Sequence, residues 1–370
     1  MSKALIKIPE LHNNDYSFME VLSGLCKSNI SNDFSFTDIS KHWNKKNKSN
    51  LLAVDLFCGC GGISKGLELA GINVIAGLDF FKEAGETYKT NFNHKFVYGD
   101  ITKNETKEEL YNTIKKELKG RKLNIVAGGF PCQGFSMSGR RDMNDPRNKL
   151  YLEVVDIVKT LNPEFLFLEN VKGLISMDGG KVKKRILEDF KNIGYEIQAH
   201  ILNAADFKTP QKRERVVFIG NRIGKKILYP QAIIKNGKYK TTKDAIEDLI
   251  DKKEDKKFSH FITKHTKDMQ ERLMQVQEGK GLYSNYSDSW KKCPWNEASC
   301  TIKENHGGVN IHPKLPRVLT VRECARIQSF PDDFLFKGTK SKQLVQIGNA
   351  VPPNLSKAVG LAILKSYEEN

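Results

Sequence analysis

Residues 51–62 read Leu-Leu-Ala-Val-Asp-Leu-Phe-Cys-Gly-Cys-Gly-Gly, an apolar run that leads into a glycine-rich turn. The apolar part, residues 51–57, has the length and composition of a buried β-strand. The next segment, residues 63–70, has helical spacing and stops at Gly71, a residue type that commonly ends helices. Glycines between a strand and a helix let the backbone turn sharply and leave room for a ligand at the helix N-terminus.

The alternation of strand-like and helix-like segments continues to residue 221. Further strands are predicted at residues 72–79, 96–98, 125–128, 165–168 and 215–220, and further helices at residues 83–92, 105–118, 150–161 and 181–193. Such alternation predicts an α/β fold with a Rossmann-like, mostly parallel sheet that carries helices on both faces.

The pattern fails between residues 222 and 316, where the chain is lysine-rich and weakly periodic. We predict a second, smaller, loop-rich domain there. Residues 319–329 and 354–367 are helical again and predict a return to the first domain. The expected organisation is therefore an N-terminal extension without assigned role (1–50), an α/β domain (51–221), the loop-rich domain (222–316) and the returning segment (317–370).

The composition favours a polyanionic partner and an intracellular location. The 370 residues carry a net charge of +16, which suits nucleic-acid binding, although a Lys-, Asn- and Ile-rich composition could produce the same charge without it. No apolar run approaches the roughly 18 residues of a membrane helix, and the N-terminus lacks a signal-peptide pattern. We therefore expect a cytoplasmic protein that contacts no membrane.

The seven cysteines are not arranged as a structural framework. Their number is odd and no two form a CxxC pair, so we expect reduced thiols and no metal site.

Acidic residues end two of the predicted strands near the glycine turn. Asp79 could accept hydrogen bonds from ribose hydroxyls, and Asp100 could contact an adenine amino group. Together with the glycine turn they fit a nucleoside cofactor, although glycine turns after strands are also common without any ligand.

The segment Gly128-Gly-Phe-Pro-Cys-Gln-Gly-Phe-Ser136 places a cysteine in a glycine-flanked loop directly after a buried strand. A free cysteine is often a small buried hydrophobic residue, but turn residues around Cys132 favour an exposed thiol. Such a thiol at the carboxyl edge of a sheet can act as a covalent nucleophile.

Charged residues end the next strand and begin the last one. Glu169 requires a partner if it is buried. Arg213 and Arg215 point to one side if the chain is extended, and could hold a base or a phosphate. The alternative is an ordinary solvated run of charge.

Six segments in this order resemble the cytosine-C5 DNA methyltransferase family of bacterial restriction–modification systems. They are DLFCGCGG (55–62), GGFPCQGFS (128–136), FLENV (167–171), QKRERV (211–216), RVLTVRECARIQSFPDDF (317–334) and QIGNAVPP (346–353). The resemblance spans residues 51–221 and 317–365, and it implies a methyltransferase fold and a target-recognition domain at residues 222–316.

The resemblance implies a DNA (cytosine-5-)-methyltransferase that uses S-adenosyl-L-methionine. Cys132 would attack carbon 6 of a cytosine, Glu169 would hold the ring near N3 and N4, and Arg213 and Arg215 would orient the base. The implied cofactor-binding residues are Asp55, Phe57, Gly59, Gly61, Gly62, Asp79, Phe80, Asp100, Ile101, Pro131, Leu150, Asn349 and Val351. Many members of the family have Glu where this chain has the shorter Asp79.

The implied substrate is double-stranded DNA, from which the cytosine must be extruded because the reaction cannot occur inside a stacked duplex. Gln133 and Ser136 are expected to meet DNA beside the catalytic loop. Lys303, Asn305 and His306 are candidate base readers near Gly307-Gly308, which could equally form only a turn. We expect a monomer, with a cognate restriction endonuclease that makes no stable contact.

Three other functions compete with this one. The same chemistry would serve an RNA cytosine methyltransferase, although the single proline before Cys132 and the long variable region favour DNA. A DNA-binding regulator without catalysis would not need Cys132, Glu169 and Arg215. A nicotinamide dehydrogenase would give the cysteine loop no purpose.

Overall fold

The computed structural model describes residues 34–131, 149–235, 237–283, 290–304 and 309–369 of the chain. Residues 35–370 form one compact unit, which contains all the elements below.

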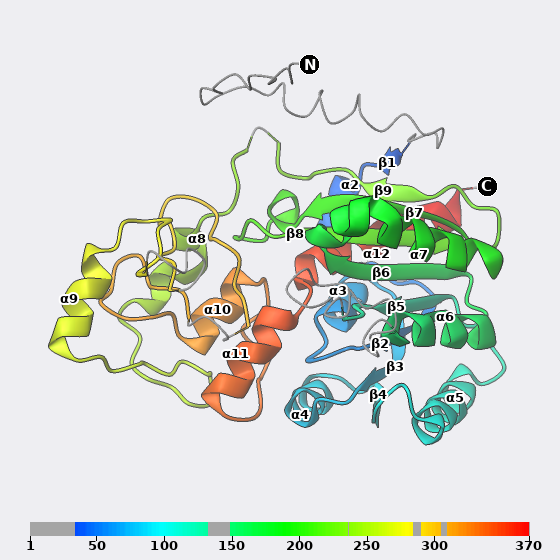
Figure 1. The fold of residues 1–370 in the computed structure, drawn as a ribbon, viewed down its shortest axis with the longest axis horizontal. Helices are drawn as coiled ribbons and strands as arrows, with labels where there is room; N and C mark the ends of the chain where they lie inside the picture. Colours follow the sequence, from blue (N-terminus) through cyan, green and yellow to red (C-terminus); the bar gives the residue numbers. More distant parts are fainter. Residues whose placement is uncertain (1–33, 132–148, 236, 284–289, 305–308, 370) are drawn as a thin grey trace, which may run out of the picture. The chain divides into compact units, whose positions relative to one another are not determined.

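A seven-stranded sheet with the order β4-β3-β2-β5-β6-β8-β7 forms the centre of this unit (Figure 1). All its neighbouring strands run parallel except β8, which is antiparallel to both β6 and β7. The strands are β2 (Leu52–Leu56), β3 (Asn73–Asp79), β4 (Lys95–Tyr98), β5 (Ile125–Gly128), β6 (Phe165–Val171), β7 (Glu196–Asn203) and β8 (Glu214–Asn221). The predicted mostly parallel α/β sheet is therefore confirmed.

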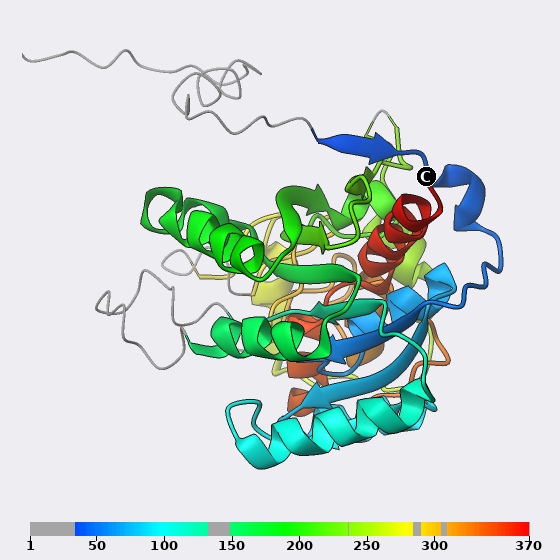
Figure 2. The same ribbon diagram turned by 90° about the vertical axis from the view of Figure 1, so that its right-hand side faces the viewer.

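Helices cover both faces of the sheet. Figure 2 shows α5, α6 and α7 on one side of the strands and α3 and α12 on the other. The buried side chains of α5, α6 and α7 share one hydrophobic core with the strands. The helices of this part are α3 (Gly62–Ala70), α4 (Lys82–Asn91), α5 (Asn104–Leu118), α6 (Lys149–Leu161), α7 (Lys181–Asn192) and α12 (Pro353–Glu368), with 3-10 turns η3 (Lys172–Gly180) and η4 (Ala204–Phe207).

The C-terminal helix α12 packs directly on α3, the helix that follows the glycine turn. The backbones approach so closely that a Cβ atom on Gly66 would clash with Ser356 and would lie 2.5 Å from the carbonyl oxygen of Pro353. A glycine at position 66 is therefore required by the packing. This contact places the start of α12 beside the glycine turn.

The segment between β8 and α12 has little regular structure. Its elements are β9 (Leu228–Pro230), α8 (Thr242–Ile246), η5 (Glu247–Leu249), α9 (Lys267–Gln275), α10 (Val321–Ile327) and α11 (Lys340–Asn349). Its buried residues, such as Trp295 and Phe330, share one hydrophobic cluster with Tyr88 of α4 and with Phe92, which directly follows α4. This segment and the α4 side of the sheet therefore stabilise each other.

Part of the N-terminal extension joins the fold. Strand β1 (Ser35–Thr37) pairs in parallel with β9, and the short helix α2 (Ser40–Trp43) follows it. Lys357 of α12 donates a hydrogen bond of 2.6 Å to the carbonyl oxygen of Trp43.

Several elements were not predicted, among them strand β7 and helix α11. Strand β7 alternates apolar residues with Gln198 and His200 instead of forming an apolar run, because it lies at the edge of the sheet. Helix α11 is rich in Lys and Gln, so its apolar positions are few. Among the described residues, no helix is long and apolar enough to cross a membrane, and no group of three or more His, Cys, Asp or Glu side chains is placed to hold a metal ion.

Candidate active site

The turn between β2 and α3 is shaped by left-handed backbone conformations. Phe57, Gly59 and Gly61 have φ angles of 54°, 53° and 99°. The turn is fastened to β3 by a hydrogen bond of 3.0 Å from the Cys58 N–H to the carbonyl oxygen of Leu78. A Cβ atom on Gly62 would clash with the carbonyl oxygen of Val351. The turn and the C-terminal motif, which the sequence assigned to one site, are therefore in direct contact.

Asp79, at the carboxyl end of β3, holds this turn in place. Its Oδ2 accepts a hydrogen bond of 2.8 Å from the Gly59 N–H, and its Oδ1 accepts one of 2.7 Å from the Phe81 N–H. Burial raises the pKa of the carboxyl group. The intervening Phe80 is 66% exposed, so its ring is open to a ligand beside the carboxylate.

Asp55, in β2, connects the strand before the glycine turn to the helix after it. Its Oδ2 accepts hydrogen bonds from the N–H and the hydroxyl group of Ser64, at 3.0 and 2.7 Å, in the first turn of α3. Its Oδ1 is buried and has no hydrogen-bond partner among the described residues. Burial raises the pKa of Asp55 to about 7.

The other predicted cofactor residues follow strand or helix ends. Asp100 is exposed just after β4, where its Oδ1 accepts hydrogen bonds from the N–H and hydroxyl groups of Thr102 at 3.0 and 2.9 Å. The remaining positions are Ile101 (buried), Pro131 and Leu150 (half-buried), Asn349 (exposed at the end of α11) and Val351 (buried). Because β2, β3, β4 and β5 are parallel, the residues that follow them gather at one edge of the sheet.

Glu169 and Arg215 meet where β6 ends and β8 begins. The antiparallel register pairs Val171 with Arg215, and the Arg215 Nε lies 2.8 Å from Oε1 of Glu169. Both side chains are largely buried, with exposed fractions of 13% for Arg215 and 10% for Glu169. Burial raises the pKa of Glu169, although the charges of Arg215 and Arg213 oppose the shift. The site therefore favours a protonated carboxyl group more than water does.

Arg213 makes different contacts from Arg215. Its buried guanidinium group donates hydrogen bonds of 2.8, 2.8 and 3.2 Å to the carbonyl oxygens of Ile302, Gly348 and Ala350. It therefore joins β8 to the loop-rich segment and to the C-terminal motif.

The backbone that leads to Cys132 lies against Glu169. A Cβ atom on Gly129 would lie 3.2 Å from the Glu169 Oε2. Asn170 donates a hydrogen bond of 2.8 Å from Nδ2 to the carbonyl oxygen of Phe130. Gly129 and Asn170 were not among the predicted site residues, although Asn170 directly follows Glu169 in the FLENV motif. Five predicted site residues lie outside the described residues: Cys132, Gln133, Ser136, Asn305 and His306.

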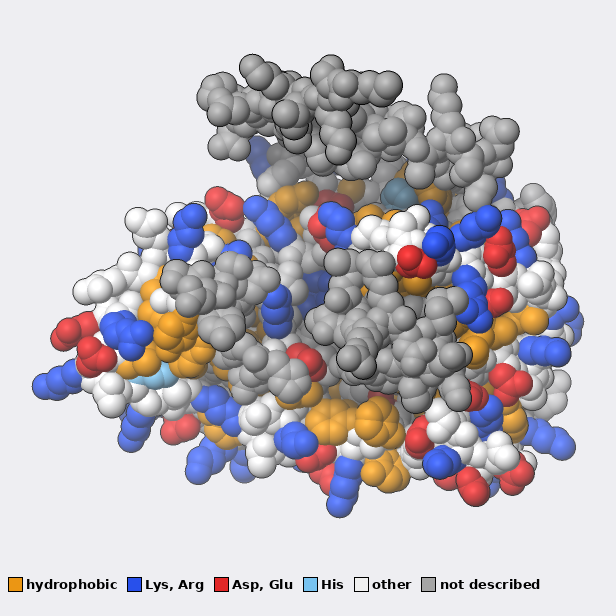
Figure 3. Space-filling model, viewed as in Figure 1, with side chains coloured by type: hydrophobic (Ala, Val, Ile, Leu, Met, Phe, Trp, Pro, Cys, Tyr) orange, Lys and Arg blue, Asp and Glu red, His pale blue; other side chains and the backbone are white. Residues whose placement is uncertain are grey.

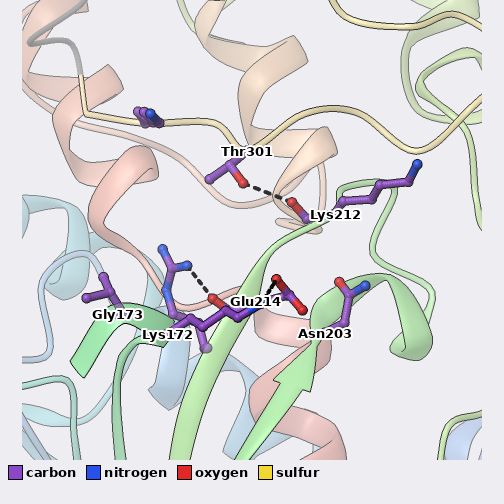
Figure 4. Close-up of a pocket in the computed structure, with 9 residues that line it drawn as sticks. Lys172, Gly173, Asn203, Lys212, Glu214 and Thr301 are labelled. Atoms are coloured by element: carbon purple, nitrogen blue, oxygen red, sulfur yellow. Dashed lines mark hydrogen bonds and ion pairs between the residues drawn. The ribbon is translucent and has the colours of Figure 1, made fainter. Parts of the chain in front are cut away.

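A pocket of about 790 Å³ opens beside Arg215 (Figure 4). Lys172 and Glu214 form an ion pair of 2.9 Å on one side of it, and the Thr301 hydroxyl donates a hydrogen bond of 2.9 Å to the carbonyl oxygen of Lys212 on the other. The lining residues are Val171, Lys172, Gly173, Asn203, Lys212, Glu214, Arg215, Thr301 and Lys303. Of the predicted DNA-binding residues, Lys303 is the described one, and it lies here.

Gln211 is a further residue that was not among the predicted site residues, although it begins the QKRERV motif. Its Oε1 accepts a hydrogen bond of 2.9 Å from the Ile302 N–H, and its Nε2 donates to Oε1 of Gln328. Gln328 in turn donates a hydrogen bond of 2.6 Å to the carbonyl oxygen of Ala350. The loop-rich segment is thus tied to β8 through backbone atoms next to Thr301.

Charge alone does not locate a binding surface. Lys and Arg side chains are spread widely over the face shown in Figure 3, with acidic side chains among them. The location of a polyanion site therefore has to come from the pocket and the strand ends.

A family model for C-5 cytosine-specific DNA methylases matches residues 51–365. The type II methyltransferase M1.HphI of Haemophilus parahaemolyticus is 36% identical to this chain over 331 residues, which cover 85% of this chain and 87% of the relative. The type II methyltransferase M.DdeI of Desulfomicrobium norvegicum is 32% identical over 375 residues, which cover 85% of this chain and 89% of that protein.

Solved structures with the same fold include one described as a DNA modification methyltransferase encoded within a prophage (E. coli). It has a TM-score of 0.70 and 27% sequence identity, and the match covers 86% of this chain and all of that chain. The Dnmt2 methyltransferase of S. pombe has a TM-score of 0.58 at 18% identity, with coverage of 86% and 100%, and supports the fold alone.

Proposed function

Because this chain belongs to the C-5 cytosine-specific DNA methylase family and is a DNA cytosine-5 methyltransferase, we propose that it moves a methyl group from S-adenosyl-L-methionine to a flipped cytosine through a covalent adduct with Cys132. The observation that carries this proposal is the buried Glu169–Arg215 pair, which lies against the backbone that leads to Cys132.

Cys132 supplies the nucleophile. The sulfur of its thiolate forms a bond to carbon 6 of the cytosine, and the electron pair of the 5,6 double bond makes carbon 5 nucleophilic. The hydrogen bond from Asn170 to the carbonyl oxygen of Phe130 fixes the backbone two residues before this cysteine. After methyl transfer, loss of the carbon 5 proton and breakage of the sulfur–carbon bond restore the aromatic ring.

Glu169 makes carbon 6 electrophilic. Since its pKa is raised by burial, the protonated carboxyl group can donate a hydrogen bond or a proton to N3 as the thiolate attacks. The Arg215 guanidinium group fixes the carboxyl orientation through Oε1. The oxygen Oε2 lies beside Gly129, where a larger residue would push it away.

The strand ends fit a nucleoside cofactor. Among the residues that the structure describes, none lies within 4 Å of the position that a Cβ atom would take on Gly59, so these residues leave open space beside the Asp79 carboxylate. We assign the ribose to Asp79, a face of the adenine to Phe80, and the adenine edge to Asp100 and Ile101. When bound, S-adenosyl-L-methionine supplies an electrophilic methyl group.

The pocket beside Arg215 is our candidate for DNA contact near the flipped nucleotide. Lys212 and Lys303 supply positive charge there, and the Thr301 and Asn203 side chains supply hydrogen-bonding groups. We assign residues 222–316 as the target-recognition domain, with residues 51–221 and 317–370 as the catalytic domain. The type II names of the relatives support a role in restriction–modification. We further propose that the protein acts as a monomer and that its cognate endonuclease makes no stable contact with it.

Bisulfite sequencing tests the proposal. Plasmid DNA is prepared from a methylation-free host that expresses this protein, with Cys132→Ser as the matched control. We expect resistant cytosines in one short recurring context with the native chain and full conversion with the variant. Full conversion with both, when the native protein is soluble and folded, would overturn the DNA assignment. Methyl transfer to tRNA would then be measured, because the same chemistry serves RNA.

A further inference from the structure

Two cysteines outside the catalytic loop lie side by side in the loop-rich segment. The Sγ atoms of Cys293 and Cys300 are 3.8 Å apart. Cys293 is completely buried, whereas Cys300 is partly exposed. One thiol of the pair is therefore accessible to a small reagent, and the other is accessible only to its neighbour.

Polar groups around the two sulfur atoms differentiate them further. The Nδ2 group of Asn310 donates a hydrogen bond of 2.9 Å to the Sγ of Cys300. The Ser299 hydroxyl donates one of 3.2 Å to the Sγ of Cys293. The Cys293 thiol, with help from Lys291 and Asn310, lowers the pKa of Cys300 to about 7. The hydrogen bond between the two thiols, together with burial, raises the pKa of Cys293. Cys300 is therefore the better nucleophile of the two near neutral pH.

We propose that Cys293 and Cys300 are a redox-active thiol pair, in which Cys300 reacts with a low-molecular-weight disulfide and Cys293 completes an intramolecular disulfide. With glutathione disulfide, the Cys300 thiolate bonds to one sulfur and releases the other as glutathione thiolate. Cys293 then loses its proton to that leaving group and attacks the Cys300 sulfur. The second glutathione leaves as a thiolate and takes a proton from solvent, so two protein thiols become one disulfide while glutathione disulfide becomes two glutathione thiols.

The pair is connected to the candidate DNA site through the backbone. Cys300 directly precedes Thr301, which lines the pocket, and Ile302, whose carbonyl oxygen accepts from Arg213. Movement of the Cys300 sulfur toward Cys293 breaks the contact with Asn310 and displaces this segment. We expect the disulfide to weaken DNA binding several-fold. This consequence rests on the proposed function, but the chemistry of the pair does not.

The test uses the full-length chain with Cys132→Ser, which removes the competing catalytic thiol. The protein is treated with glutathione disulfide and digested without reduction, and the peptides are identified by mass spectrometry. We expect a linkage between Cys293 and Cys300 that dithiothreitol reverses, while the buried Cys324 stays unmodified. The rate of reaction should rise about tenfold between pH 6 and pH 8 and then level off, because the thiolate of Cys300 is then fully formed.

Two further variants in the same background assign the roles. Cys293→Ser should leave a stable glutathione adduct on Cys300, whereas Cys300→Ser should leave Cys293 unmodified. Failure of Cys300 to react, or an equal rate at Cys293 in the Cys300→Ser protein, would overturn the proposal. Unchanged DNA affinity after quantitative disulfide formation would overturn the connection to the DNA site. Neither result depends on methylation activity, so both are distinguishable from failure of the proposed function.

Discussion

The Nε atom of Arg215 lies 2.8 Å from Oε1 of Glu169, and the other carboxyl oxygen, Oε2, faces the backbone of Gly129. Both oxygens of the carboxyl group are thus confined, one by charge and the other by lack of space. This confinement, together with the raised pKa, suits a group that must present one hydrogen to a base in a fixed position.

Glu169→Gln tests the acid role directly. The amide keeps the size of the side chain and can still donate a hydrogen bond, but it cannot transfer a proton. We expect the single-turnover methylation rate to fall by about 10²–10⁴-fold, the usual contribution of a positioned acid, while DNA affinity changes by only a few-fold. Rapid quench with tritiated S-adenosyl-L-methionine measures the rate. A variant as fast as the native enzyme would rule out proton transfer by Glu169.

Arg213, directly before β8, and Arg215, within β8, should differ in the effects of their replacement. Arg213 satisfies three backbone carbonyl groups from two other segments, so Arg213→Ala leaves buried acceptors without partners and should destabilise the fold by about 3 kcal/mol or more. Arg215→Ala removes the ion-pair partner of Glu169, but the carboxyl group can then take up a proton because burial already raises its pKa. This variant should therefore destabilise the fold less than Arg213→Ala, and it should lower the methylation rate at least about a hundredfold. Thermal unfolding and single-turnover assays on both variants measure the contrast. Equal losses of stability would contradict the division of roles.

The fold was largely predictable because parallel α/β sheets bury apolar strands that stand out in the sequence. Strand β5, for example, is a four-residue buried run with the predicted bounds. Strand β7 was not predicted, because an edge strand has one half-polar face and its alternation resembles that of a loop or an amphipathic segment. The antiparallel direction of β8 also has no local signature, because it depends on how the chain returns from β7.

The candidate site was predictable where residues carry chemistry and unpredictable where they act through the backbone. Glu169 and Arg215 were predicted as site residues from their charge and the order of their motifs, whereas the ion pair between them was not predicted. The side-chain contacts of Gln211 and Asn170 go mainly to backbone atoms of distant segments, and spacing along the chain contains no information about such partners. Arg213 shows the same limit. It is the same residue type as Arg215 and lies in the same motif, but the two side chains contact different groups.

Gly62→Ala tests the contact between the glycine turn and the C-terminal motif. The new methyl group would clash with the carbonyl oxygen of Val351, which cannot move without displacing α12. We expect a loss of about 2 kcal/mol or more in the free energy of unfolding, together with weaker S-adenosyl-L-methionine binding. Gly173→Ala is the matched control, because no described residue lies within 4 Å of its Cβ position. Chemical unfolding and calorimetry measure both effects, and a Gly62→Ala protein as stable as the control would contradict the packing argument.

Asp55 should make the protein less stable as the pH rises. Its pKa is raised to about 7 by burial, so its stabilising contribution is fully present below about pH 4 and is lost as the pH rises through 7. The full effect of such a shift is about 4 kcal/mol. Asp55→Asn keeps an acceptor for Ser64 but cannot ionise, so its free energy of unfolding should fall less between pH 4 and pH 8 than that of the native chain. Urea unfolding at several pH values gives the two slopes, with Asp100→Asn as an exposed control. Because the new amide group can itself be poorly satisfied, the difference in slope and not the absolute stability decides the result. Parallel curves for the native chain and Asp55→Asn would mean that the buried carboxyl group keeps an ordinary pKa.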